Sequence, residues 1–102
     1  MTKNVSAALP LLDRMTTILE QSKDDNDRQF VTALGRGLTL LAAFEQHEQL
    51  SHQQLCQITS LPKATITRLI HTLMTLGFLR MTEHGQYQLG SSAVRLSATA
   101  WS

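Results

Sequence analysis

The side chains best suited to contact a ligand gather between residues 62 and 76. Short, hydroxyl-bearing and basic side chains occur together there, and they are Lys63, Ala64, Thr65, Thr67, Arg68 and His71. A lysine and an arginine can donate hydrogen bonds to phosphate oxygens or to guanine. Short side chains beside them let a backbone come close to base edges. This set predicts contact with a nucleic acid, although a solvated helix surface would have a similar composition.

Other kinds of site chemistry find little support in the chain. His52 and Cys56 lie four residues apart, a spacing that can place two metal ligands on one helix face. Two ligands are too few, and a lone cysteine on an apolar face is interpreted as a small hydrophobic side chain. Thr65 and Thr67 have no evident activating base, and the sequence shows no grouping typical of a catalytic triad or of paired carboxylates. We therefore expect no enzyme, no metal and no other cofactor.

The charge of the chain is more informative in its distribution than in its sum. The formal net charge of +1 is low for a nucleic-acid-binding domain. From Gln49 to Thr82, however, there is no Asp or Glu, whereas Lys63, Arg68 and Arg80 all fall in this segment. A segment without carboxylates suits contact with phosphates, because like charges would repel.

Length and composition limit the class of protein. The chain has 102 residues, which is room for one small domain. Its single cysteine fits a reducing cytoplasm, and it has no apolar run long enough to span a membrane. The start of the sequence lacks a charged segment followed by an apolar block, so we expect no secretion signal and a cytoplasmic location.

The polar set requires a helix whose opposite face is buried. Aliphatic residues recur at helical spacing on that face, and they are Ile66, Leu69, Ile70, Leu73 and Leu76. Pro62 is expected at the first helical position, because its missing N–H lies where no intrahelical bond forms. Gly77 is the expected left-handed cap.

Two helices are expected before this one. Leu34, Leu38 and Leu41 predict a helix over about residues 31–46. Gly37 inside it costs about 0.5–1 kcal/mol relative to alanine, which indicates either close packing or the close approach of a partner at that position. Ser51 and Gln54 form a capping-box pattern that begins a short second helix, which ends near residues 59–61.

A hairpin is expected after Gly77. Residues 79–82 and 87–89 alternate like half-buried strands, with a turn over 83–86 whose tip lies at His84. The order of helix, short helix, tight turn, longer helix and hairpin predicts a winged helix-turn-helix, a mainly α fold with a small β-hairpin. In such a unit the second helix enters the major groove of DNA. We expect His84, at the wing tip, to contact the DNA backbone or the minor groove.

The chain divides into three expected parts. Residues 1–29 form an N-terminal arm and linker, residues 30–90 the winged helix-turn-helix domain, and residues 91–102 the start of a linker helix. Within the arm, residues 9–22 have an apolar face that would suit either a partner-docking helix or a flexible segment. The flexible segment is the preferred interpretation, because short isolated helices are marginal in water.

The chain resembles the IclR family of bacterial transcription regulators. The matching segments span about residues 32–90 and include Leu61-Pro62-Lys63-Ala64-Thr65, followed by Arg68-Leu69, and Gly85-Gln86-Tyr87-Gln88-Leu89-Gly90. The resemblance implies a homodimer that reads a roughly palindromic operator in double-stranded DNA, most often as a repressor. It also implies DNA contacts by Lys63, Ala64, Thr65, Thr67, Arg68 and His71, with Ser51 and Arg36 touching phosphates.

Two features depart from the family pattern. The family commonly has glycine where Ser60 stands, so the turn between the two helices is expected to be less relaxed here. Family members continue into a larger effector-binding domain, so we expect a fragment or a shortened regulator with no small-molecule effector site. A protein-interaction module with the same fold, without nucleic-acid binding, is the alternative function.

Overall fold

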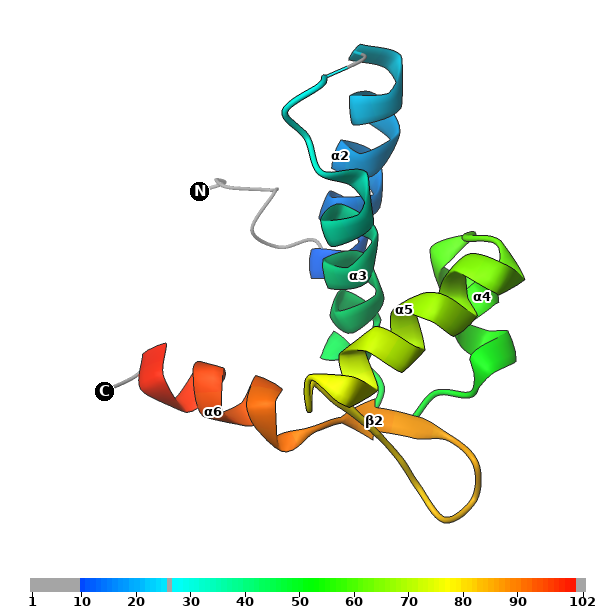
Figure 1. The fold of residues 1–102 in the computed structure, drawn as a ribbon, viewed down its shortest axis with the longest axis vertical. Coiled ribbons are helices and arrows are strands. Elements are labelled where there is room, and N and C mark those ends of the chain that lie inside the picture. The colour runs from blue at the N-terminus through cyan, green and yellow to red at the C-terminus, as the bar shows by residue number, and fades with distance from the viewer. Residues whose placement is uncertain (1–9, 26, 101–102) are drawn as a thin grey trace, which may run out of the picture.

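The chain folds into a mainly helical structure with a small antiparallel hairpin (Figure 1). The computed structural model describes residues 10–25 and 27–100. Its elements are α2 (Leu11–Asp25), α3 (Thr32–Ala42), the 3-10 helix η1 (Ala43–Glu45), α4 (His52–Thr59), α5 (Lys63–Thr75), β1 (Leu79–Met81), β2 (Tyr87–Leu89) and α6 (Ser91–Ala100). This order confirms the predicted winged helix-turn-helix. None of the helices in the described part is long and apolar enough to cross a membrane.

The core lies where α3, α4, α5 and β1 meet. Its buried side chains are Leu40, Ala43, Phe44, Leu50, Leu55, Ile66, Ile70 and Leu79. Ile66 is completely buried and Ile70 is 4% exposed, so α5 turns the predicted aliphatic face inward. Burial of a leucine or isoleucine side chain contributes about 1.5–3 kcal/mol. This packing holds the opposite face of α5 toward solvent.

The start of α4 and the turn before α5 follow local sequence signals. Ser51 Oγ accepts a hydrogen bond from the Gln54 amide at 3.1 Å, and Gln54 Oε1 accepts one from the Ser51 amide at 2.8 Å, which confirms the capping box. Ser60 adopts a left-handed conformation with φ of 60°, a region that favours glycine. Pro62 is the N-cap of α5 and not its first helical residue as predicted, because its ψ of 149° is extended, and the helix begins at Lys63.

A backbone bridge links the wing to the segment before α4. In the hairpin, Leu79 pairs with Leu89 and Met81 pairs with Tyr87. Tyr87 also forms a backbone bridge with Leu50, which directly precedes the α4 cap. The wing is therefore hydrogen-bonded to the segment that begins the helix-turn-helix.

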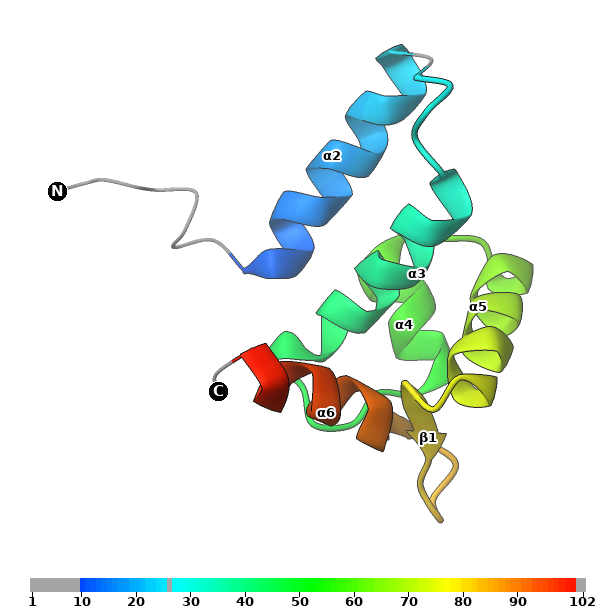
Figure 2. The ribbon, with the colours of Figure 1, turned by 60° about the vertical axis from the view of Figure 1, so that its left-hand side comes forward.

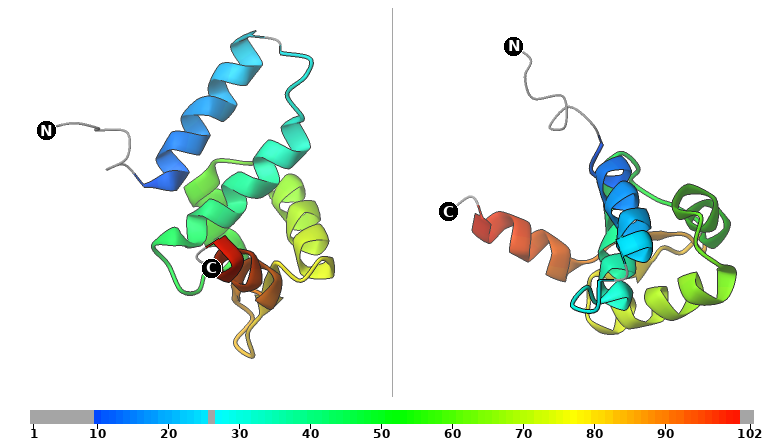
Figure 3. Two further views of the ribbon diagram at one scale, coloured as in Figure 1. Left: turned by 90° about the vertical axis from the view of Figure 1, so that its left-hand side faces the viewer. Right: turned by 90° about the horizontal axis from the view of Figure 1, so that it is seen from above.

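The N-terminal segment corrects the preferred interpretation of a flexible arm. In Figures 2 and 3, α2 lies alongside α3 and runs antiparallel to it, and Leu19 of α2 is 7% exposed. The Leu11 amide also donates a hydrogen bond to Glu45 Oε1 at 2.6 Å. Packing against α3 supplies the stability that an isolated helix lacks. The helix extends to Asp25, into the expected linker, while residues 1–9 of the expected arm lie outside the described residues.

The close approach expected at Gly37 occurs two residues earlier. A Cβ on Gly35 would lie 2.9 Å from Phe30 Cζ and 3.2 Å from Leu19 Cδ1, whereas a Cβ on Gly37 would lie 3.8 Å from Leu69 Cδ2. The second distance is an ordinary van der Waals contact. The expectation of close packing at Gly37 within the chain is therefore wrong, whereas the close approach of a partner there stays a prediction. Gly35 is the residue that lets α2 and its loop approach α3.

Candidate nucleic-acid interface

The outer face of α5 is uncovered along its length. Figures 2 and 3 show α5 at the margin of the molecule, with α3 and α4 on its inner side. Lys63, Ala64, Thr67, Arg68 and His71 are all exposed, whereas Thr65 is half-buried. The structure therefore places the polar residues predicted from the sequence on one helix, where all of them except Thr65 are exposed.

The N-terminal end of α5 has a positive electrostatic character. No side chain caps it, and its first turn contains no acidic residue. The first amides of a helix lack intrahelical acceptors, and the helix dipole adds partial positive charge at this end. Lys63 adds a full positive charge. Among the described residues, the recorded ion pair joins Lys23 and Glu20 of α2, whose Nζ and Oε2 atoms are 3.8 Å apart. Lys63 and Arg68 therefore form no ion pair with a described residue that would neutralise their charges.

A hollow beside α5 brings two arginines to one place. Arg36 of α3 and Arg68 of α5 both line it, and its other lining residues are Ala33, Thr65, Leu69 and Thr72. Arg36 Nε is buried and has no hydrogen-bond partner among the described residues. A buried donor without a partner costs about 1–3 kcal/mol. The hollow has no acidic lining residue, so an anion is the chemical group that it suits.

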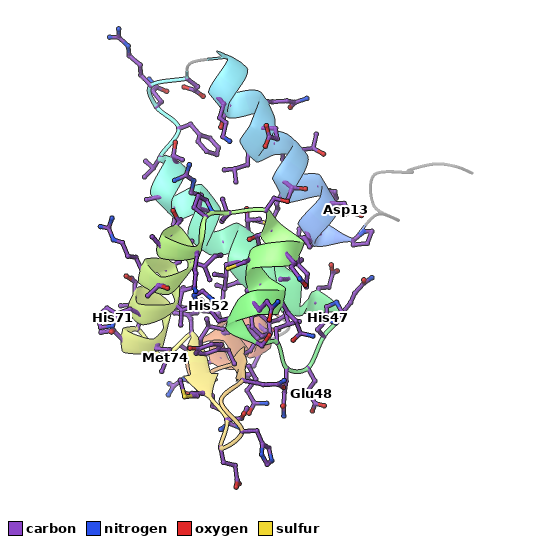
Figure 4. The ribbon with its side chains drawn as sticks, turned by 90° about the vertical axis from the view of Figure 1, so that its right-hand side faces the viewer. Asp13, His47, Glu48, His52, His71 and Met74 are labelled. Carbon is purple, nitrogen blue, oxygen red and sulfur yellow. The ribbon has the colours of Figure 1, made fainter. Side chains whose placement is uncertain are left out.

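A hydrogen-bonded chain connects α4 to the outer face of α5. His52 Nε2 lies 2.9 Å from Thr67 Oγ1, and His52 Nδ1 lies 3.6 Å from Cys56 Sγ. In Figure 4, His52 lies between the two helices, whereas His71 lies on the outer side of α5. The four-residue spacing of His52 and Cys56 signalled a shared helix face. Nothing in the sequence signalled the contact with Thr67, which lies 15 positions away.

The remaining predicted contact residues lie on other elements. The Ser51 hydroxyl accepts the capping bond from Gln54 and donates to none of the described residues, so its hydrogen is available to an acceptor. His84 is exposed in the turn between β1 and β2, next to Gly85, whose φ is 78°. Ser51 therefore marks the start of α4, and His84 marks the wing tip.

A comparison with known protein families matches the segment that carries this site. The model of the IclR helix-turn-helix domain matches residues 33–83, half of the chain, and so includes α4, α5, β1 and all of α3 except Thr32. The chain belongs to the IclR family. The resemblance drawn from Lys63, Ala64, Thr65 and Arg68 is confirmed, and the domain is the helix-turn-helix of a family of transcription regulators.

Individual IclR-family relatives agree with this assignment. The HTH-type transcriptional regulator TsaQ1/TsaQ2 of Comamonas testosteroni is 47% identical over 51 residues, or 50% of this chain and 18% of that protein. The Pca regulon regulatory protein of Pseudomonas putida is 38% identical over 53 residues, or 51% of this chain and 18% of that protein. The crystal structure of an IclR family transcriptional regulator from Brucella abortus is 46% identical with a TM-score of 0.67, covering 72% of this chain and 29% of that one.

These relatives are regulators and not enzymes. The chain spans less than a fifth of the length of the two curated relatives, and it spans about three tenths of the Brucella abortus chain. The similarity therefore concerns the helix-turn-helix part of these proteins.

Proposed function

We propose that this chain is a sequence-specific DNA-binding domain that places α5 in a major groove. The outer face of α5 carries the proposal, because it is exposed and free of acidic residues while the opposite face is buried in the core. A major groove about 12 Å wide admits an α-helix. In this arrangement bases and nearby phosphates are contacted by Lys63, Ala64, Thr65, Thr67, Arg68 and His71.

Phosphates on either side of the groove are assigned to residues on other elements. Arg36, which lines the hollow beside α5, would donate a guanidinium N–H to a phosphate oxygen, and Ser51 would donate its free hydroxyl hydrogen to another. His84 would contact the backbone or the minor groove from the wing tip. Such contacts set the position of a protein on a duplex, whereas base contacts specify the sequence.

We further propose that the chain acts as a homodimer on a palindromic operator, as a cytoplasmic repressor. Exposed apolar side chains on α3 and after α5 support association, with Leu34 60%, Leu38 47% and Leu76 59% exposed. A two-fold dimer would present two copies of α5 to two half-sites about one helical turn of DNA apart. Residues 30–90 form the DNA-binding domain in this proposal, and residues 91–102 begin a linker helix.

The same apolar side chains favour a second candidate function, a protein-interaction module without nucleic-acid binding. The two candidates differ in their response to salt. DNA binding through phosphates loses affinity steeply as salt rises, with a slope of about 0.9 for each phosphate contact on a logarithmic plot. A contact built on apolar burial changes little with salt.

The first test is to select bound duplexes from a random DNA pool with the 102-residue chain. Recovery of a palindrome would support specific binding by a dimer. Recovery of no enriched sequence, together with binding of a protein partner that is insensitive to salt, would favour the second candidate.

The second test measures affinity for the selected duplex across a salt series. The double variant Lys63→Ala/Arg68→Ala is expected to bind more weakly, with the salt slope reduced by about 0.9 for each lost phosphate contact. The variant Arg14→Ala/Arg28→Ala removes the same charge from exposed positions outside α5 and is the matched control. Operator binding by the first variant as tight as that of the parent would contradict the proposal.

A further inference from the structure

Thr67 differs from the other threonines of α5 because a residue of another helix holds its hydroxyl. Thr67 Oγ1 donates to the Lys63 carbonyl oxygen at 3.1 Å, and it lies 2.9 Å from His52 Nε2. Thr72 and Thr75 make the same backbone bond, to the carbonyls of Arg68 and His71, without a histidine contact. Thr67 is therefore the member of this group with two protein partners.

The number of hydrogens available determines what the Thr67 hydroxyl can offer. A threonine hydroxyl has one hydrogen and two lone pairs. When that hydrogen points to the Lys63 carbonyl, the hydroxyl accepts from His52 Nε2–H, and the Cys56 thiol donates to His52 Nδ1. In the other tautomer of His52, the hydroxyl donates to Nε2, and Nδ1–H donates to Cys56 Sγ. In both arrangements the hydrogen is used within the protein, and at least one lone pair of the exposed hydroxyl stays without a partner among the described residues.

We propose that Thr67 is a specificity residue that acts only as a hydrogen-bond acceptor, and that His52 is the positioning residue that enforces this. The inference rests on the proposed placement of α5 in the major groove. There, adenine offers an amino hydrogen at N6 and cytosine offers one at N4, whereas guanine and phosphate oxygens present acceptors. Thr67 therefore selects an amino group of adenine or cytosine and does not contact a phosphate. This separates its role from that of Ser51, whose hydroxyl hydrogen is free.

The test removes one amino group at a time from the DNA. Each adenine or cytosine of a selected half-site is replaced by the analogue without its amino group, purine or 2-pyrimidinone. At one position, affinity of the parent chain is expected to fall about three- to tenfold, the effect of one net hydrogen bond. Thr67→Val, which keeps the shape and removes the hydroxyl, is expected to lose this sensitivity. Thr67→Ser is expected to retain it, and so is the control Thr75→Val.

The role of His52 is tested by two amides of different length. His52→Gln places an N–H donor near the position of Nε2, and it is expected to retain the sensitivity to the missing amino group. His52→Asn is too short to reach Thr67, so the Lys63 carbonyl alone holds the hydroxyl hydrogen, and the sensitivity is expected to be smaller than in the parent. A purely structural role would not distinguish the two variants in this way. Circular dichroism of each variant verifies that the helices are intact.

The outcomes separate this inference from the proposed function. If the parent binds the selected duplex and Thr67→Val keeps the full sensitivity, the assignment of Thr67 is overturned while DNA binding stands. A sensitivity to 7-deazaguanine, which lacks the guanine N7 acceptor, that the parent shows and Thr67→Val loses would overturn it in the same way. A parent chain that binds no duplex would overturn both.

Discussion

Replacement of Arg36 by methionine is expected to change stability and DNA affinity in opposite directions. Arg36 Nε is buried without a partner in the described part of the chain. Such a donor costs about 1–3 kcal/mol, and because the whole residue is only half-buried we expect about 1 kcal/mol to be recovered. Methionine keeps an unbranched apolar stem in the hollow beside Leu69. The free energy of unfolding of Arg36→Met should therefore rise.

The DNA affinity of the same variant should fall. A hydrogen bond to a charged group contributes about 1.5–3 kcal/mol, which corresponds to a loss of roughly ten- to a hundredfold in affinity. Urea unfolding followed by circular dichroism gives the first quantity, and fluorescence anisotropy with the selected duplex gives the second. Arg28→Met, at an exposed position before α3, is the control and should change both little.

The directions in which the free energy of unfolding and the DNA affinity change together test the role assigned to Arg36. A variant that loses both stability and affinity would show that the guanidinium stabilises the fold and that its unpaired Nε does not indicate a ligand site. A variant that gains stability and keeps full affinity would show that the hollow between α3 and α5 does not hold a phosphate.

Two further predictions concern the backbone. Gly35→Ala should lower the free energy of unfolding by about 1–3 kcal/mol, because its Cβ would lie 2.9 Å from Phe30 Cζ. Gly37→Ala should instead raise it by about 0.5–1 kcal/mol, because its Cβ would lie 3.8 Å from Leu69 Cδ2, an ordinary contact. Thermal or urea unfolding of both variants measures the contrast, and equal effects would contradict the packing argument. Ser60→Gly should raise the free energy of unfolding by about 1 kcal/mol, because φ of 60° is unfavourable for a side chain. A loss of stability in the same unfolding measurement would show that Ser60 contributes more than its conformation costs.

Features that depend on residues close together in the chain could be predicted from the sequence. The capping box of Ser51 and Gln54 and the left-handed Gly77 involve residues a few positions apart, so their spacing in the chain is their spacing in space. The buried face of α5 follows the helical repeat from Ile66 to Ile70. Because one face must be buried, the opposite face, with Lys63 and Arg68, is exposed. The candidate site on α5 was therefore predictable before its surroundings were known.

Features that depend on which elements meet were decided by tertiary structure alone. The segment that ends at Asp25 has the same apolar pattern whether it is flexible or folded, and contact with α3 makes it a helix. The close approach at Gly35, the pairing of His52 with Thr67 and the unpaired Nε of Arg36 each join residues from different elements. A sequence records the type of each side chain, whereas a hydrogen bond or a steric contact depends on the relative position of two backbones. That position is set by the packing of the whole core.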